Sequence, residues 1–222
     1  TLILIIFLSS KLPTFVAIFI ILFDIYWLLK TIYLSLHLRA TFKAMNKNLK
    51  IDWAGRLEAF PHWQEIYHLI IFPMYQEPYE VVRESFDTVI KTNYPKNRFI
   101  VVLAVEDRAG KEALGVARRI EEEFGGKFFK FLVTTHPAGL PREIPGKGSN
   151  ETWAAREAKR LIVDPLKLDY KKILVSVFDI DTQVFAGYFG RLTYVFLTSE
   201  KPLRAIYQPI PFFTNNIYKA PA

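Results

Sequence analysis

The feature that most constrains the fold is an apolar run near the N-terminus. Residues 12–29 (LPTFVAIFIILFDIYWLL) are 18 positions with one charged side chain, Asp24. As a helix that rises about 1.5 Å per residue, the run reaches about 27 Å, close to the thickness of the hydrocarbon core of a bilayer. The run therefore predicts a helix that spans a membrane.

A one-sided basic excess follows this run. Lys30, Arg39, Lys43, Lys47 and Lys50 come next, without an acidic residue among them, whereas the other basic residues of this chain of net charge +7 are scattered. Basic flanks mark the cytoplasmic end of a membrane helix, so we expect a cell-membrane protein whose chain lies on the cytoplasmic face from about residue 50 onward. This explanation of the charge is favoured over a nucleic-acid patch, and no nucleic-acid partner is expected.

The chain divides into three predicted regions. Residues 1–50 are expected to form the transmembrane and juxtamembrane region, and residues 51–66, with aromatic and mixed charged side chains, an interfacial linker. Residues 67–222 are expected to form part of an α/β domain. Because the sequence begins with Thr1 inside an apolar stretch, we interpret the chain as a fragment.

Apolar runs alternate with helical spacing after residue 66. The strands are predicted at 67–72, 99–105, 128–133 and 173–178, and the helices at 79–92, 110–124 and 150–163. Nearly continuous apolarity indicates strands that are buried on both faces, so the pattern predicts a mostly parallel sheet flanked by helices. The Pro- and Gly-rich stretch 136–148 is too long for an ordinary connection, which is typical of a functional or mobile loop.

The last predicted strand ends in a pair of aspartates, Asp179 and Asp181. In extended backbone, alternate residues face the same side, so both carboxylates can reach one point. Two hard oxygen ligands suit Mg²⁺ or Mn²⁺, whereas thiolate sites are excluded because the chain has no cysteine. The alternative is structural: Asp181 or Thr182 caps the apolar segment that follows.

Two phosphate-handling motifs are excluded by single positions. A Walker A loop around Lys147 needs Ser or Thr where Gly148 stands and Gly where Pro141 stands. The aspartyl-phosphate pattern of haloacid dehalogenase-like phosphatases needs Thr where Gln183 stands.

Four segments, in this order, resemble the family 2 glycosyltransferases of GT-A fold, over about residues 67–215. They are 70–77 (IIFPMYQE), 101–107 (VVLAVED), 146–150 (GKGSN) and 178–182 (FDIDT). The chain departs from the family pattern at Gln76, which replaces an Asn, and at Glu106, which replaces an Asp. The spacing from Lys147 to Asn150 is also shorter than in the family.

The resemblance implies a membrane-bound enzyme that transfers sugar from a nucleotide-diphosphate sugar, with inversion, to a glycan or lipid-linked acceptor. It assigns donor binding to Pro73, Tyr75, Glu77, Glu106, Asp107, Lys147, Asn150 and Asp179. It also assigns Mg²⁺ or Mn²⁺ binding to Asp179 and Asp181. The general base that activates the acceptor is expected beyond Ala222.

Two other functions stay open at this point. A membrane-tethered scaffold could bind a nucleotide sugar without transferring it. A nucleotidyltransferase would also use paired aspartates and Mg²⁺ on an α/β sheet, but such enzymes usually open with a Gly-rich phosphate loop, and none occurs near Tyr67.

Overall fold

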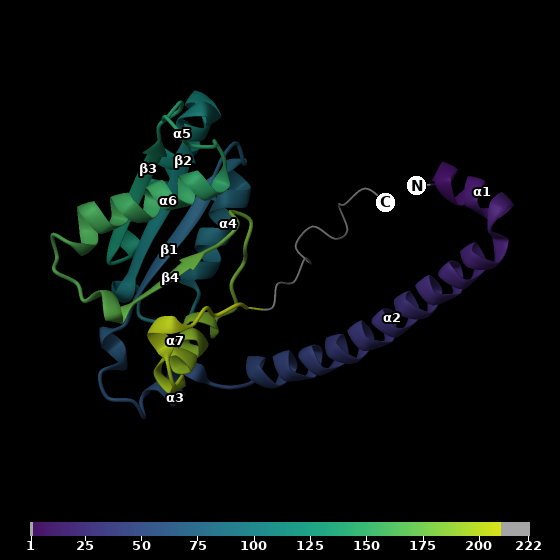
Figure 1. Cartoon of the computed structure of the whole chain (residues 1–222). Coiled ribbons are helices and arrows are strands. Elements are labelled where there is room, and N and C mark those ends of the chain that lie inside the picture. Colours follow the sequence, from purple (N-terminus) through teal and green to yellow (C-terminus); the bar gives the residue numbers. More distant parts are fainter. Residues whose placement is uncertain (1, 210–222) are drawn as a thin grey trace. The chain divides into compact units, whose positions relative to one another are not determined.

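The computed structural model describes residues 2–209, which fall into two units that divide between Ile51 and Asp52. The first unit holds the helices α1 (Leu2–Lys11) and α2 (Pro13–Leu49), and the second is an α/β domain (Figure 1). Residues 210–222, the last part of the predicted domain, lie outside the described residues.

Helix α2 is longer than the span that the sequence predicts. It runs through 37 residues, about 55 Å at 1.5 Å per residue, because it contains no glycine and its one proline, Pro13, stands in the first turn. None of residues 13–49 is buried. Among residues 2–209, α2 is the one helix that is long and apolar enough to cross a bilayer.

The α/β unit contains a parallel sheet of four strands within the described residues, as predicted. The order is β3-β2-β1-β4. The strands are β1 (Tyr67–Met74), β2 (Phe99–Glu106), β3 (Lys130–His136) and β4 (Ile173–Val177). Strand β3 ends three residues later than predicted, which places His136 level with Glu106 of β2.

Helices cover both faces of the sheet. The main helices of this unit are α4 (Tyr79–Ile90), α5 (Gly110–Phe124), α6 (Lys147–Ala158) and α7 (Tyr188–Thr198). A π-helical turn, Lys159–Val163, continues α6, and short 3₁₀ turns occupy Trp63–Glu65, Lys96–Arg98, Asp107–Ala109, Gly125–Lys127, Tyr170–Lys172 and Pro202–Arg204.

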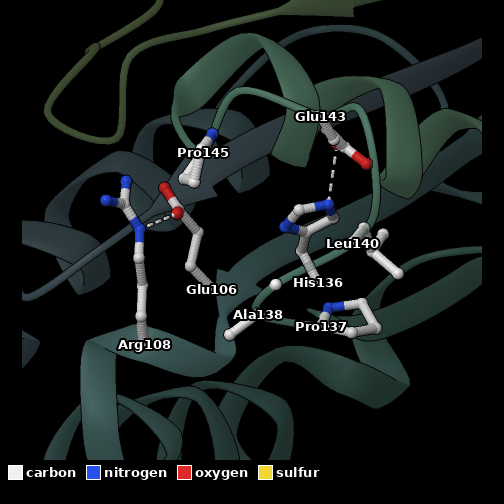
Figure 2. Close-up of a pocket in the computed structure, with 9 residues that line it drawn as sticks. Glu106, Arg108, His136, Pro137, Ala138, Leu140, Glu143 and Pro145 are labelled. Carbon is white, nitrogen blue, oxygen red and sulfur yellow. Dashed lines mark hydrogen bonds and ion pairs between the residues drawn. The ribbon is translucent and has the colours of Figure 1, made fainter.

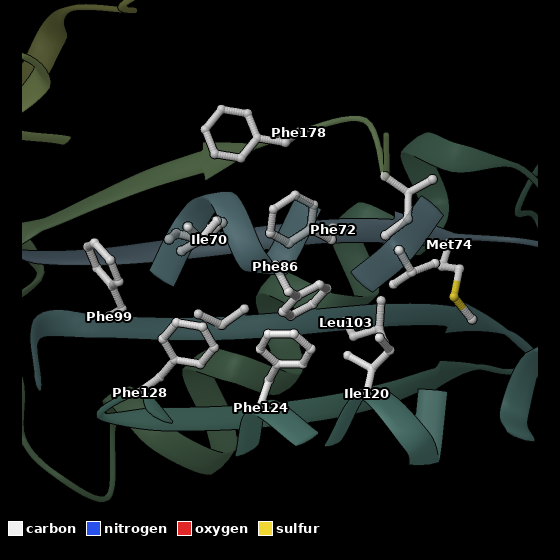
Figure 3. Packing of buried hydrophobic residues seen from close by; sticks show 14 of the residues in the cluster. Ile70, Phe72, Met74, Phe86, Phe99, Leu103, Ile120, Phe124, Phe128 and Phe178 are labelled. Carbon is white, nitrogen blue, oxygen red and sulfur yellow. The ribbon is translucent and has the colours of Figure 1, made fainter. Parts of the chain in front are cut away.

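The alternation of side chains along each strand creates two apolar cores. On one face, Ile70, Phe72 and Leu103 pack with Phe86 of α4 and Phe124 of α5 (Figure 3). On the other face, residues that include Leu69, Ile71 and Val102 pack against Ala154 and Ala158 of α6. Because both faces of β1 and β2 are buried, these strands are apolar at nearly every position.

Residues 51–66, the expected linker, contribute to the folded α/β unit. They form α3 (Trp53–Leu57) and a 3₁₀ turn, and the side chains of Trp53 and Leu57 are buried. Helix α7 packs closely on α3, since a Cβ atom added at Gly190 would lie 3.2 Å from Cβ of Trp53. The α/β unit therefore begins at Asp52.

Candidate functional site at the carboxyl edge of the sheet

The predicted site residues gather where the parallel strands end. Strands β1, β2, β3 and β4 run in the same direction, so the segments that follow Met74, Glu106, His136 and Val177 emerge at one edge. In open α/β sheets this edge is where ligands bind.

Asp179 and Asp181 lie just beyond the end of β4. The residues that alternate with them, Phe178 and Ile180, are buried, which leaves both carboxylates exposed. The segment is held in place, because Ser85 of α4 donates a hydrogen bond to the carbonyl of Ile180 at 2.6 Å. Residues 179–182 form a turn, closed by a hydrogen bond of 2.9 Å from the Thr182 N–H to the Asp179 carbonyl, so the shared orientation expected of extended backbone stays a prediction.

The alternative role of Asp181 or Thr182 as a helix cap is wrong. The next helix, α7, begins only at Tyr188, and its N-terminal flanking residue is Gly187. Neither Asp181 nor Thr182 therefore holds the N-cap position of this helix. Capping therefore does not explain the pair.

Lys147 and Asp179, which are 32 residues apart in sequence, meet at the same edge. The Lys147 ammonium, in the first turn of α6, donates a hydrogen bond to the Asp179 carboxylate, and both side chains are more than half exposed. Lys147 Nζ also lies 3.9 Å from Glu151 Oε1. The structure thus brings together a cation and an anion that the resemblance implies for one site.

Asn150 is placed differently, inside the protein. Its Nδ2 atom donates a hydrogen bond of 2.8 Å to the carbonyl of Ala104 on β2, which ties the start of α6 to the sheet. Its Oδ1 atom is buried and has no hydrogen-bond partner among the described residues. Asn150 therefore positions the helix that carries Lys147.

Glu106, Arg108 and Tyr75 form a second group at the edge. The Glu106 side chain is buried and accepts a hydrogen bond from Arg108 Nε. The Arg108 guanidinium also lies 5.1 Å from the centre of the Tyr75 ring, which is exposed. Asp107, the neighbour of Glu106, is exposed in the 3₁₀ turn that follows β2.

Pro73 and Glu77 shape the end of β1. Pro73 is a buried residue of the strand, level with Ala104 of β2. The Glu77 carboxylate accepts a hydrogen bond of 2.7 Å from the backbone N–H of Tyr75, and Gln76 Nε2 donates to the carbonyl of Ala109 at 3.2 Å. These bonds hold the turn that presents Tyr75.

The loop 137–146 covers the ends of β2 and β3 (Figure 2). With Glu106, Arg108 and His136 it lines a cavity of about 40 Å³, and His136 Nε2 lies 3.0 Å from Glu143 Oε1 across it. A water needs about 10–15 Å³ of such volume, so this cavity has room for water but not for a nucleobase. A base that reached Glu106 would need the loop to move.

Sequence reasoning did not single out three residues of this site: Arg108, His136 and Glu143. Arg108 directly follows the acidic pair, and this proximity is the signal that could have identified it. His136 was missed because the predicted strand ended at 133, short of the edge. Glu143 carries no local signal, since its pairing depends on how the loop folds back onto β3.

The donor set of Asp179 and Asp181 fits a divalent cation that completes its shell with phosphate and water oxygens. Among residues 2–209 there is no group of three or more His, Asp or Glu side chains arranged to hold a metal ion. Two carboxylates at the edge of a sheet are suited to hold a diphosphate through a shared cation, and one ammonium beside them is suited to contact the diphosphate directly.

No protein-family model matches the chain, and no curated protein matches it.

Proposed function

We propose that the α/β unit is the donor-binding part of a metal-dependent glycosyltransferase that uses a nucleotide-diphosphate sugar and resembles family 2 of GT-A fold. The observation that carries the proposal is the aspartate pair. Asp179 and Asp181 are both exposed at the carboxyl edge, with Lys147 in contact with Asp179. Capping of the next helix does not account for this arrangement.

The proposed mechanism assigns separate tasks to these groups. Asp179 and Asp181 would hold Mg²⁺ or Mn²⁺, which supplies positive charge to the donor diphosphate. Lys147 would exchange its contact with Asp179 for the same diphosphate and stabilise the charge that develops on it. An acceptor hydroxyl oxygen bonds to the anomeric carbon, its proton passes to a general base, and the diphosphate leaves with the electron pair of the broken C–O bond.

The nucleoside is assigned to the other half of the edge. Glu106 and Asp107 offer carboxylate acceptors to base and ribose donors, and the exposed Tyr75 ring offers a flat surface. The small cavity under loop 137–146 implies that the loop opens when the donor binds. The acceptor is proposed to be a glycan or a lipid-linked molecule.

Membrane attachment through α2 completes the proposal. The helix is exposed along residues 13–49 and is long enough to cross a bilayer. The basic residues that follow the apolar run favour an arrangement with the α/β unit on the cytoplasmic face of the cell membrane.

The decisive test replaces Asp181 by Asn in the full chain and measures nucleoside-diphosphate and nucleotide-sugar affinity by calorimetry, with and without Mn²⁺. Asn keeps the size of Asp and removes its charge, so the metal-dependent affinity should fall about 10-fold or more, where a tenfold change is about 1.4 kcal/mol. Thermal stability should be unchanged. Asp169→Asn, at an exposed aspartate that caps a 3₁₀ turn, is the matched control.

Three outcomes would count against the proposal. Equal metal-dependent affinity in wild type and Asp181→Asn would refute the metal assignment. Metal-dependent binding of nucleoside triphosphates, with release of pyrophosphate, would favour a nucleotidyltransferase. Donor binding without any sugar transfer by the longest natural form of the protein would favour a scaffold.

A further inference from the structure

The second half of α2 carries a basic stripe. Arg39, Lys43 and Lys47 follow one another at intervals of four residues, so they lie on one face of the helix, and Lys50 follows at its C-terminal end. No acidic residue occurs from position 30 to position 50. The stripe is therefore not neutralised by neighbours on its own helix.

An apolar stripe lies beside it. It consists of Leu38, Phe42, Met45 and Leu49, which are spaced by four, three and four residues. At 3.6 residues per turn, the mean direction of these side chains around the helix axis is roughly 130° from that of the basic stripe. Leu38, Phe42 and Leu49 are exposed. A helix end with an apolar face and a basic face has the composition of a segment that lies in a membrane interface.

Aromatic residues mark where the membrane surface crosses α2. Lys30 Nζ lies 4.7 Å from the centre of the Trp27 ring and 5.7 Å from that of Tyr26, and the rings of Tyr33 and His37 lie 4.2 Å apart. Tyr and Trp gather at the level of lipid headgroups, so these residues place the interface at the end of the apolar run. The two stripes begin about two turns farther along the helix.

Distance decides which orientation lets the basic stripe act. In an upright helix Lys47 would stand about 25 Å beyond Lys30, well outside the Debye length of about 8 Å in physiological salt. Helix α2 curves along its length instead of running straight (Figure 1). Arg39, Lys43, Lys47 and Lys50 can all reach the headgroups only if the second half of the helix leans toward the bilayer.

We propose that residues 38–50 of α2 lean toward the bilayer surface, as far as the continuous curve of the helix allows, with the apolar stripe facing the interface and the basic stripe reaching anionic lipid headgroups. The inference rests on the membrane placement proposed above. A second copy of the chain fits this surface less well, because no acidic residue between positions 30 and 50 could pair with the basic stripe of a neighbouring helix.

The chain has no cysteine, so a single introduced cysteine carries a spin label at one known position. We would label Met45→Cys on the apolar stripe and Ala40→Cys on the opposite side of α2, in the full chain reconstituted into vesicles. In phosphatidylcholine vesicles that contain phosphatidylglycerol, the label at 45 should be shielded from a water-soluble relaxation agent and the label at 40 should be accessible. In vesicles of phosphatidylcholine alone, this difference should be lost.

Neutralising the stripe tests its charge. The variant Arg39→Gln, Lys43→Gln, Lys47→Gln should lose the shielding at 45 in anionic vesicles, since each basic residue near such a surface contributes about a fivefold change in surface occupancy. The matched control changes three exposed lysines of the α/β unit, Lys91→Gln, Lys111→Gln and Lys201→Gln, and should behave like wild type.

Each contrary outcome has a separate reading. Equal accessibility at 40 and 45 in anionic vesicles would overturn the inference. Shielding of the label at 45 that does not depend on lipid charge would also overturn the inference. Such shielding would indicate that residue 45 contacts the α/β unit. If spin–spin broadening also grows with the labelled fraction, it would indicate contact with a second copy of the chain. A label at Phe19→Cys reports on the span itself. If the label at 19 is exposed to water, the proposed membrane placement is wrong. If the label at 19 is buried but the labels at 40 and 45 do not differ in accessibility as expected, only the lipid-surface inference is refuted.

Discussion

At the scale of single residues, His68 shows how burial changes the chemistry of a side chain. It is fully buried among the rings of Tyr94, Phe99 and Phe189, and its Nε2 atom lies 2.9 Å from Thr193 Oγ1. Burial lowers the pKa of His68 from 6.5 to about 3, because a charged imidazolium is poorly solvated there. His68 therefore stays neutral in the folded protein at any physiological pH and supports the packing of α7.

This shift predicts a pH-dependent stability. Between about pH 3 and pH 6.5 the unfolded chain binds a proton at His68 that the folded chain does not, so stability is complete above pH 6.5 and falls as the pH is lowered. At pH 5 the loss is about 2 kcal/mol, since one pKa unit is worth about 1.4 kcal/mol. Urea unfolding at pH 5 and pH 8 measures it. His68→Gln, which keeps a hydrogen-bonding group toward Thr193, should show a smaller pH dependence, and an identical one would contradict the assignment.

At the scale of elements, the loop 137–146 controls access to the carboxyl edge. Its closed conformation is held across the cavity by the pair of His136 and Glu143, whose side chains are 6% and 32% exposed. Gly139 and Arg142 have positive φ angles of 75° and 65°. The positive φ of Arg142 is an unfavourable backbone conformation for a residue with a Cβ atom, so local contacts are needed to maintain it.

Glu143→Ala should open this loop. The variant removes the partner of His136, and a hydrogen bond to a charged group contributes about 1.5–3 kcal/mol, so the open population should rise about 10-fold or more. Hydrogen exchange of the backbone amides of residues 137–146, followed by mass spectrometry, measures the open population. Glu112→Ala, on the exposed side of α5, is the control and should exchange at the wild-type rate. Equal exchange rates in Glu143→Ala and wild type would show that the pair does not hold the loop.

At the scale of the whole molecule, the chain consists of two units that differ in whether their apolar side chains are exposed or buried. Helix α2 exposes its apolar side chains, whereas the α/β unit from Asp52 buries its own in a continuous core. Trp53 and Leu57 are buried in the α/β unit, and the centre of the Trp53 ring lies 5.3 Å from that of Tyr194 on α7. The membrane attachment proposed above would give the exposed apolar side chains of the first unit an apolar solvent.

A chain that begins at Asp52 should therefore fold without α1 and α2. We expect cooperative thermal unfolding of residues 52–222 in aqueous buffer, followed by circular dichroism. In that chain Leu57→Ala should lower Tm by about 10 °C, because a Leu→Ala change in a core costs about 2–5 kcal/mol and each kcal/mol shifts Tm by about 2–4 °C in a domain of this size. Leu203→Ala, at a leucine that is 60% exposed, is the matched control. If both variants unfold at the wild-type temperature, α3 does not contribute to the core.

The sequence predicts the four strands and the helices α4, α5 and α6 of the α/β unit, because their cause is local, but it does not predict α3 or α7. Two-sided burial produces apolar runs such as 99–105, and one-sided burial produces the helical spacing of Gly110–Phe124, which the structure reproduces at both ends. The prediction fails where the local signal is weak. The end of β3 is polar, so its last three residues, Thr134, Thr135 and His136, did not resemble a strand although they pair with β2.

The sequence by itself determined the long apolar helix and the parallel α/β pattern, because side-chain periodicity and chain direction are properties of adjacent residues. Only the tertiary structure decided that Lys147 meets Asp179, that Asn150 is buried against Ala104, and that residues 52–66 belong to the folded unit. These contacts join positions from 32 to more than 100 residues apart, and they exist only because the strand order and the packing of α6 and α7 bring distant segments together.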